Sequence, residues 1–453
     1  MSGKEKNALT EKLSFIEKLT FGIGDAGANF VWSFLAAFMT IYLTDTVGLG
    51  AALIGTIIFV CRIFDGVSDL FMGSLIDNTD SKMGKAKPWV FWTAPILGVL
   101  VYMIFNVPSS LSEGYKYAYV AIIYFFISAV FYTANNVAYS SLTSFMTNRP
   151  EDRVSLGSIR FVCAITAILF INGYTNRLVE YFGGGQPGWQ KVSLIYGILC
   201  ALFLMITGYF VKERNVAKTT KSHNRVSFKD SFSALLKSRY FYLIFLLYLF
   251  MYMRISSSGV AIFYAQYVLK NPGSMAILSF ASQLPSILVL IFYGKIAGKF
   301  GIRKTMIAGT IMALIGYIVA SINSENLTWL VIGLAIGNMG ALPLTAAASA
   351  LVADMADYVY WETNVPVQGT AFSTTSAGMK LGTGIASAAV GWVLAWGGYI
   401  PNSINQPGSS IFSMKLLYLY FPIIILVLIL VIVVIIDIEK HMPKVRKELA
   451  ERE

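Results

Sequence analysis

Apolar stretches of about 20 residues recur along the whole chain, and short polar segments separate them. Because about 20 apolar residues in a helix cross a bilayer, this pattern predicts an all-α membrane protein with twelve transmembrane helices and no strands. The expected spans are 17–44, 50–76, 88–107, 116–146, 156–182, 190–212, 240–269, 275–298, 303–322, 327–353, 370–397 and 411–437.

The widest interior polar gap divides these spans into six plus six. We therefore expect an N-terminal six-helix bundle at 1–212, a cytoplasmic linker at 213–239, a C-terminal six-helix bundle at 240–437 and a cytoplasmic tail at 438–453. Gly73–Pro88 and Gly294–Lys304 follow the second and eighth spans, and each contains a basic loop with glycine. Their equivalent positions favour a duplicated transporter bundle, with ordinary basic loops as the alternative.

Lys and Arg gather in one set of loops and at both termini, whereas the opposite loops hold few of them. Cytoplasmic loops of membrane proteins carry this excess of positive charge. We therefore expect both termini in the cytoplasm. The first 18 residues are charged and lack a small-residue cleavage site, so we expect no removable signal peptide.

Composition supports a membrane protein, since 56% of residues are hydrophobic and only 13% are charged. The net charge of +11 is explained by topology, so we expect no nucleic-acid partner. Cys61, Cys163 and Cys200 lie in apolar spans and predict no disulfide. The two histidines lie in polar segments, and no P-loop motif is present. We expect no enzymatic activity, no catalytic residues and no cofactor.

Two acids in the second span are the most informative residues. Asp65 and Asp69 are four positions apart in an otherwise apolar helix, so their carboxylates share one face. Charges near the bilayer centre are costly and usually face a wet cavity. Repulsion between two carboxylates favours binding of a small cation or a proton. Arg62 lies on the same face, either offsetting this charge or forming a structural ion pair with Asp65.

Three further charges lie within apolar spans. Arg160 is expected to bind sugar hydroxyls or a carboxylate, or to extend its side chain to the cytoplasmic surface. Arg254 lies too deep in the seventh span for that extension. An anionic substrate or an acid such as Asp25 is its expected partner. Asp25, beside glycines in the first span, is expected to face the cavity or to pair with that arginine.

Several motifs occur together in this chain. They are Gly24-Asp25-Ala-Gly-Ala-Asn29-Phe30 with Tyr42-Leu-Thr-Asp45-Thr-Val-Gly48-Leu49, Arg62-Ile-Phe-Asp65-Gly-Val-Ser68-Asp69 with Gly73, Gly84-Lys85-Ala-Lys87-Pro88-Trp89, Tyr132-Thr133, Arg160-Phe161, Asp354-Met-Ala-Asp357-Tyr358 after the tenth span, and Lys380. Together they resemble the glycoside–pentoside–hexuronide:cation symporter family, the relatives of melibiose permease within the major facilitator superfamily.

The resemblance implies roles for individual residues. Asp65 and Asp69 would bind the cation, as metal ligands if it is Na⁺, and Thr133 would add a hydroxyl. Ser68 stands where melibiose permease has an Asn tied to sodium use, so both Na⁺ and H⁺ stay open. The expected substrate-binding residues are Asp25, Asn29, Asn136, Arg160, Arg254 and Lys380. The expected gating residues are Asp77, Lys85, Asp354 and Asp357.

Asn29 and Asn136 stand where melibiose permease has aspartates that hold galactosyl hydroxyls, and Ser140 replaces its stacking tryptophan. The resemblance therefore points to the glucuronide-transporting branch. We expect a symporter of the bacterial cytoplasmic (inner) membrane that imports a glycoside, a glucuronide or hexuronide before others, by alternating access. The alternatives are a neutral pentoside or glycoside symporter and a lipid or lysolipid carrier. Its expected partners are the sugar, the coupling cation and membrane lipid.

Overall fold

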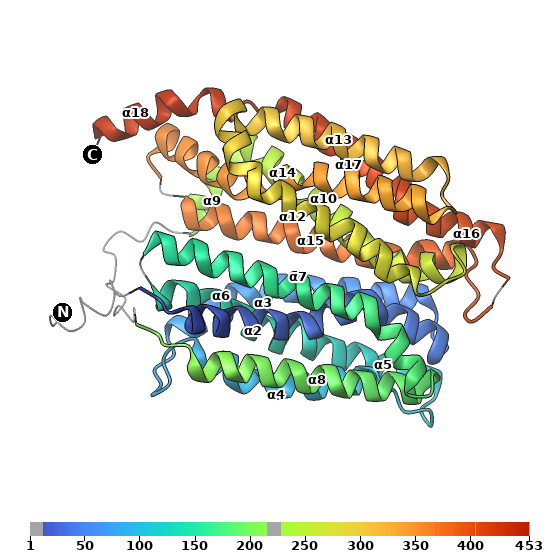
Figure 1. Ribbon diagram of the computed structural model, residues 1–453. Coiled ribbons are helices and arrows are strands. Elements are labelled where there is room, and N and C mark those ends of the chain that lie inside the picture. Colours follow the sequence, from blue (N-terminus) through green and yellow to red (C-terminus); the bar gives the residue numbers. More distant parts are fainter. Residues whose placement is uncertain (1–11, 148, 215–227, 366, 404, 453) are drawn as a thin grey trace. The chain divides into compact units, whose positions relative to one another are not determined.

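The computed structural model describes residues 12–147, 149–214, 228–365, 367–403 and 405–452 (Figure 1). Within these ranges the regular structure is helical and no strand occurs, which confirms the all-α fold class. Two compact units are present, Met1–Thr220 with Pro401–Ser403 and Lys221–Ile400 with Ile404–Glu453. We refer to them as the N-terminal and C-terminal units.

The N-terminal unit contains six long helical segments. Two of them include π-helical turns. In order, its elements are α2 (Phe15–Phe34), η1 (Leu35–Met39), η2 (Tyr42–Thr46), α3 (Ala51–Asp77), α4 (Lys87–Ile104), α5 (Glu113–Phe125), η3 (Phe126–Tyr132), α6 (Thr133–Met146), α7 (Pro150–Tyr181) and α8 (Gly185–Phe210).

 The π-helical turns of the N-terminal unit are η1 and η2 in the first segment and η3 in the fourth.

The C-terminal unit also contains six long helical segments, followed by a short helix at the end of the chain. In order, its elements are α9 (Phe228–Lys237), α10 (Arg239–Ser256), η4 (Ser257–Val260), α11 (Ala261–Phe263), η5 (Tyr264–Val268), α12 (Ser274–Phe300), α13 (Ile302–Ile322), α14 (Leu327–Thr363), α15 (Gln368–Trp396), α16 (Gly408–Lys415), η6 (Leu416–Tyr420), α17 (Phe421–Ile435), η7 (Ile438–Lys440) and α18 (Met442–Arg452).

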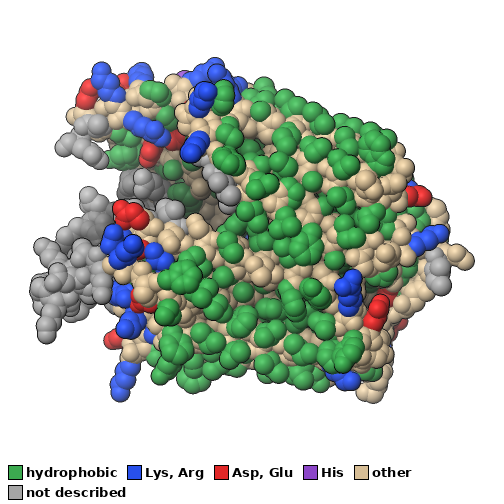
Figure 2. Space-filling model, in the orientation of Figure 1, with side chains coloured by type: hydrophobic (Ala, Val, Ile, Leu, Met, Phe, Trp, Pro, Cys, Tyr) green, Lys and Arg blue, Asp and Glu red, His purple; other side chains and the backbone are tan. Residues whose placement is uncertain are grey.

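The twelve long segments follow the apolar pattern of the sequence, and ten of them are long and apolar enough to cross a membrane. The other two are the first, which contains Asp25 and Asn29, and α12, whose apolar part is only Ser274–Val289. Many large apolar side chains are exposed. Figure 2 shows hydrophobic side chains over much of the visible surface, as expected for a lipid-facing protein.

Two helix ends differ from the sequence prediction by six residues or more. Helix α7 begins at Pro150 instead of 156, and α14 continues to Thr363 instead of ending at 353. Both extensions are polar, so hydropathy does not detect them. Asp354 and Asp357, which we expected after the tenth span, therefore lie inside α14.

The same helix pairs pack together in both units. In the N-terminal unit, α2 packs on α7 and α8, and α4 packs on α8. In the C-terminal unit, α10 packs on α15 and α17, and α13 packs on α17. Because each pair holds equivalent positions in its half of the chain, this packing is what a duplicated six-helix bundle predicts.

A glutamate after the last long segment of each unit binds the start of that unit's third segment. Glu213 accepts hydrogen bonds from the backbone N–H groups of Lys85, Ala86 and Lys87, at 2.8, 2.9 and 2.8 Å. Glu439 accepts them from Ile302 and Arg303, at 3.0 and 3.1 Å. A carboxylate is favourable there because the first N–H groups of a helix lack partners within the helix.

The glycines of the two basic loops leave room for these carboxylates. Gly84 has φ +115°, and a Cβ atom there would lie 2.6 Å from the Glu213 carboxyl carbon. Gly301 has φ +88°, and its Cβ would lie 2.9 Å from Glu439 Oε1. The repeated glycine of the sequence thus has a steric reason in both units.

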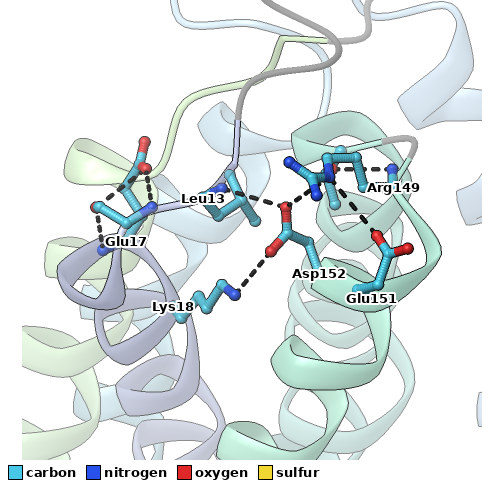
Figure 3. A network of polar contacts seen from close by, with 8 residues as sticks. Leu13, Glu17, Lys18, Arg149, Glu151 and Asp152 are labelled. Carbon is cyan, nitrogen blue, oxygen red and sulfur yellow. Dashed lines mark hydrogen bonds and ion pairs between the residues drawn. The ribbon is translucent and has the colours of Figure 1, made fainter.

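Ion pairs also join the first segment of each unit to the residues that follow its last segment. Glu17 pairs with Arg214 at 2.6 Å, and Arg239 pairs with Asp437 at 2.8 Å. The two pairs have opposite polarity. Figure 3 shows a neighbouring network in which Asp152, at the start of α7, pairs with Lys18 at 2.7 Å.

We predict that Glu213→Ala lowers stability by about 1–3 kcal/mol, because three N–H groups lose a charged acceptor. The measurement is the thermal unfolding midpoint of the purified protein in detergent. Gly84→Ala should also lower this midpoint, and the double variant should lose less than the sum of the two. Glu180→Ala, which removes an exposed acid from the same unit, is the control. Additive losses would contradict the steric link between Gly84 and Glu213.

Candidate functional site

The acidic face of α3 lies against the segment formed by η3 and α6. Arg62 and Asp65 are buried, and Asp69 is half-buried. Arg62 Nη1 lies 3.5 Å from Asp65 Oδ2, so the expected contact between these two side chains is present. Ser68 donates a hydrogen bond to the Asp65 carbonyl oxygen at 3.0 Å.

Thr133 lies directly beside the Asp65 carboxylate. Its hydroxyl is 2.5 Å from Asp65 Oδ1 and 2.9 Å from the Ser128 carbonyl oxygen. Thr133 is the first residue of α6 and follows the π-helical turn η3. Such turns shift the side chains that follow them and are frequent at functional sites. Carboxylate, hydroxyl and carbonyl oxygens are thus brought together, and these atoms are ligands for hard cations.

This oxygen-rich group has few strong metal ligands. Among the described residues, no cluster of three or more His, Cys, Asp or Glu side chains is arranged to hold a metal ion.

An aromatic pair, Trp32 and Tyr132, lies beside Arg62. The Arg62 guanidinium carbon lies 3.7 Å from the centre of the Trp32 ring. Trp32 stacks on Tyr132, with ring centres 4.5 Å apart and planes 21° apart. Arg62 is thus stabilised by a cation–π contact as well as by Asp65. Trp32 thus contacts Arg62 on one side and Tyr132 on another.

Asp25 of α2 pairs with Arg160 of α7, with 3.0 Å between Oδ1 and Nε. Arg160 also lies 5.0 Å from the centre of the Tyr139 ring. Its guanidinium is thus held by Asp25 and Tyr139, while about a third of the side chain stays exposed. The structure thus gives Asp25 an ionic partner within its own unit, Arg160.

The asparagines differ in their surroundings. Asn29 donates to the Asp25 carbonyl oxygen at 2.8 Å and accepts from Ser33 at 2.8 Å, so its amide is engaged within α2. Asn136 is half-buried, and its amide has no hydrogen-bond partner among the described residues. Asn135, its neighbour, is buried and donates to Thr93 Oγ1 at 2.8 Å.

The C-terminal unit holds Arg254 in the last turn of α10, where its side chain is only 9% exposed. Arg254 Nη1 donates to the Tyr317 hydroxyl at 3.3 Å and to Asn338 Oδ1 at 3.5 Å. Sequence reasoning missed Tyr317 and Asn338, because no local signal marks residues that converge from α13 and α14. Lys380 is half-buried in α15.

The α-helical ladder stops at Ser256, two residues after Arg254. Residues Ser257–Val260 form the 3₁₀ turn η4, and η5 follows as a π-helical turn. The Ser257 hydroxyl donates to the Arg254 carbonyl oxygen at 2.8 Å, and Ser258 donates to the Ile255 carbonyl at 2.7 Å. Ser257 and Ser258 thus supply hydrogen-bond donors for backbone carbonyl groups near the point where the α-helix ends.

The expected gating residues lie in several places. Asp354 pairs with Arg446 of α18 at 2.8 Å, so it has a partner in the C-terminal tail. Trp361 of the same helix donates to Glu448 of α18 at 2.6 Å. Asp357 is half-buried, and Lys85 contacts Glu213 through its backbone N–H. The side chain of Asp77 lies outside the described part of the chain.

Comparison with known proteins gives a consistent result. Residues 20–440 match the family described as MFS/sugar transport protein. The isoprimeverose transporter of Lactiplantibacillus pentosus is 27% identical, covering 96% of this chain and 91% of that protein. A glucuronide carrier protein homolog of Escherichia coli (strain K12) is 26% identical, covering 88% of this chain and 87% of that protein.

A solved structure with a similar fold is that of a mutant of the nucleoside transporter NupG. Its TM-score is 0.67 at 15% identity, covering 92% of this chain and 99% of the other. This likeness concerns the fold alone. The match over residues 20–440, together with the relatives, confirms the resemblance seen in the sequence. The chain therefore belongs to the MFS/sugar transport protein family, as a multi-pass membrane protein of the glycoside–pentoside–hexuronide:cation symporter group in the major facilitator superfamily.

Proposed function

We propose that the protein imports a glycoside together with H⁺ or Na⁺ by alternating access. The observation that carries this proposal is the contact of Asp65 with Thr133, at 2.5 Å, on the acidic face of α3. A carboxylate beside a hydroxyl and a carbonyl oxygen supplies the oxygen ligands that a small cation requires. In this proposal Asp65, Asp69, Ser68 and Thr133 bind the coupling ion.

Arg62 completes the electrostatics of the proposed cation site. Its guanidinium lies 3.5 Å from Asp65 and offsets part of the negative charge when the cation is absent. A cation that binds Asp65 therefore weakens the attraction between Asp65 and Arg62. Arg62 also contacts Trp32, and Trp32 stacks on Tyr132. Tyr132 interacts electrostatically with both polar groups of the unit, which are Arg62 with Asp65 and Asp25 with Arg160.

The second polar group, Asp25 with Arg160, is our candidate for sugar recognition in the N-terminal unit. Arg160 and Asp25 offer a donor and an acceptor within one ion pair, and Asn136 adds an amide that lacks a partner in the described residues. A sugar hydroxyl both donates and accepts, so such a group suits it. Asn29 is proposed to act mainly by positioning Asp25 through their hydrogen bond.

Among glycosides we favour a hexuronide, which agrees with the similarity to a glucuronide carrier homolog. The second candidate is a neutral glycoside that contains a pentose. The similarity to an isoprimeverose transporter favours it. We propose that the protein lies in the inner membrane of a bacterium with both termini in the cytoplasm, which the lysine and arginine pattern of the loops supports. Asp77, Lys85, Asp354 and Asp357 are proposed to act in gating.

We predict that Asp69→Asn abolishes uphill sugar accumulation, because the cation site loses one of its two carboxylates. Exchange of sugar down its gradient should persist, since the proposed sugar contacts lie elsewhere. Both are measured in proteoliposomes at matched protein content. Asp80→Asn, which removes an exposed acid after α3, should accumulate sugar normally. Normal accumulation by Asp69→Asn would remove Asp69 from the coupling site.

We predict that Thr133→Val weakens binding of the coupling ion by about 10- to 100-fold, since a hydrogen bond to a charged group contributes roughly 1.5–3 kcal/mol. The measurement is the ion concentration, or the pH, that gives half-maximal uptake. Thr133→Ser retains the hydroxyl and should stay close to the unchanged protein. If Thr133→Val and Thr133→Ser behave alike, the hydroxyl is not a ligand.

A further inference from the structure

A buried cation in the C-terminal unit has only neutral partners. Arg254 lies fifteen positions after Arg239, the first residue of α10, which is about 22 Å along the helix axis. Its side chain is too deep to reach the aqueous surface easily. Among the described residues, its hydrogen-bond partners are the Tyr317 hydroxyl and the Asn338 amide oxygen. Neither neutralises its charge, and an uncompensated buried charge is costly.

The neighbours of Arg254 are themselves fixed in place. Asn338 donates from Nδ2 to the Leu334 carbonyl oxygen at 3.0 Å, which orients its amide oxygen toward Arg254. The Tyr317 ring packs beside Gly337, where a Cβ atom would lie 3.1 Å from the ring. Tyr317 and Asn338 thus hold Nη1 of the guanidinium from one side.

The other edge of the guanidinium is open. Both hydrogen-bond partners of Arg254 among the described residues bind Nη1. Nε and Nη2 have no hydrogen-bond partner among these residues, and neither atom is fully buried, unlike Arg62 Nε and Arg303 Nε. The Nε and Nη2 edge therefore faces space that solvent or a ligand reaches. This edge presents two parallel N–H donors, the geometry that binds a carboxylate in a bidentate manner.

We propose that Arg254, positioned by Tyr317 and Asn338, is the subsite that binds the carboxylate of a hexuronide. The inference rests on the proposed function, since it assigns the group that selects among the sugars carried. A carboxylate supplies the missing negative charge and uses the free edge of the guanidinium. The 3₁₀ turn that follows Arg254 places this subsite beside the break in the α-helical ladder of the seventh span.

The test uses pairs of sugars that differ only at C6. The probes are methyl glucuronide and methyl galacturonide with their neutral counterparts, methyl glucoside and methyl galactoside. Affinity is measured by calorimetry on the purified protein and transport by counterflow in proteoliposomes. Arg254→Gln should weaken uronide binding on the order of 100-fold, the scale for hydrogen bonds to a charged group. Binding of the neutral sugars should stay close to that of the unchanged protein.

Two more variants separate charge from geometry. Arg254→Lys keeps the charge but loses the fork of donors, so its loss for uronides should be intermediate. Tyr317→Phe removes the positioning hydroxyl and should reduce the preference for uronides over neutral sugars. Lys237→Gln removes an exposed positive charge just before α10 and should leave that preference unchanged.

Equal losses of uronide and neutral sugar in Arg254→Gln would overturn the subsite, as would an unchanged protein that prefers the neutral sugar of each pair. Cation-dependent transport of neutral sugars would in both cases leave the proposed function standing. If no sugar in the panel binds or moves, the proposed function fails and the subsite fails with it. If Arg254→Gln loses uronide binding alone and still transports neutral sugars, the result supports both the subsite and the proposed function.

Discussion

A charge removed from water needs a compensating group, and this constraint governs where the charged side chains of this protein lie. Deep in the N-terminal unit, Arg62 pairs with Asp65 and Arg160 pairs with Asp25. Each pair lowers the cost of burial that either member would carry alone. Arg254 differs because its protein partners are neutral. Among the described residues, the deep arginines Arg62 and Arg160 of the N-terminal unit thus have acidic partners, whereas Arg254 of the C-terminal unit has neutral ones.

Carboxylates at the helix ends satisfy the same constraint with backbone groups. The N–H groups at the start of α4 and α13 have Glu213 and Glu439 as acceptors. These contacts fix the third segment of each unit against the residues that follow its last segment. Tyr317, a partner of Arg254, is thus carried by a helix, α13, whose start is held by charge-assisted hydrogen bonds.

The sequence predicts the helices well because each span is a continuous apolar run, and it predicts the acidic face of α3 because helical periodicity is local. It misplaces the ends of α7 and α14, where the helices continue into polar residues. The π-helical turn before Thr133 has no local signature, and neither does the convergence of Tyr317 and Asn338 on Arg254. Those features depend on contacts between helices that are distant in sequence.

The opposite polarity of the two terminal ion pairs bears on how a duplicated chain assembles correctly. Each unit closes when residues after its last segment meet the start of its first, through Glu17 with Arg214 and through Arg239 with Asp437. If the wrong ends met during synthesis, Glu17 would face Asp437 and Arg214 would face Arg239. Like charges would then repel, and that repulsion discriminates against the wrong partner. In this way one ion pair in each unit favours contact between that unit's own two ends over contact with the ends of the other unit.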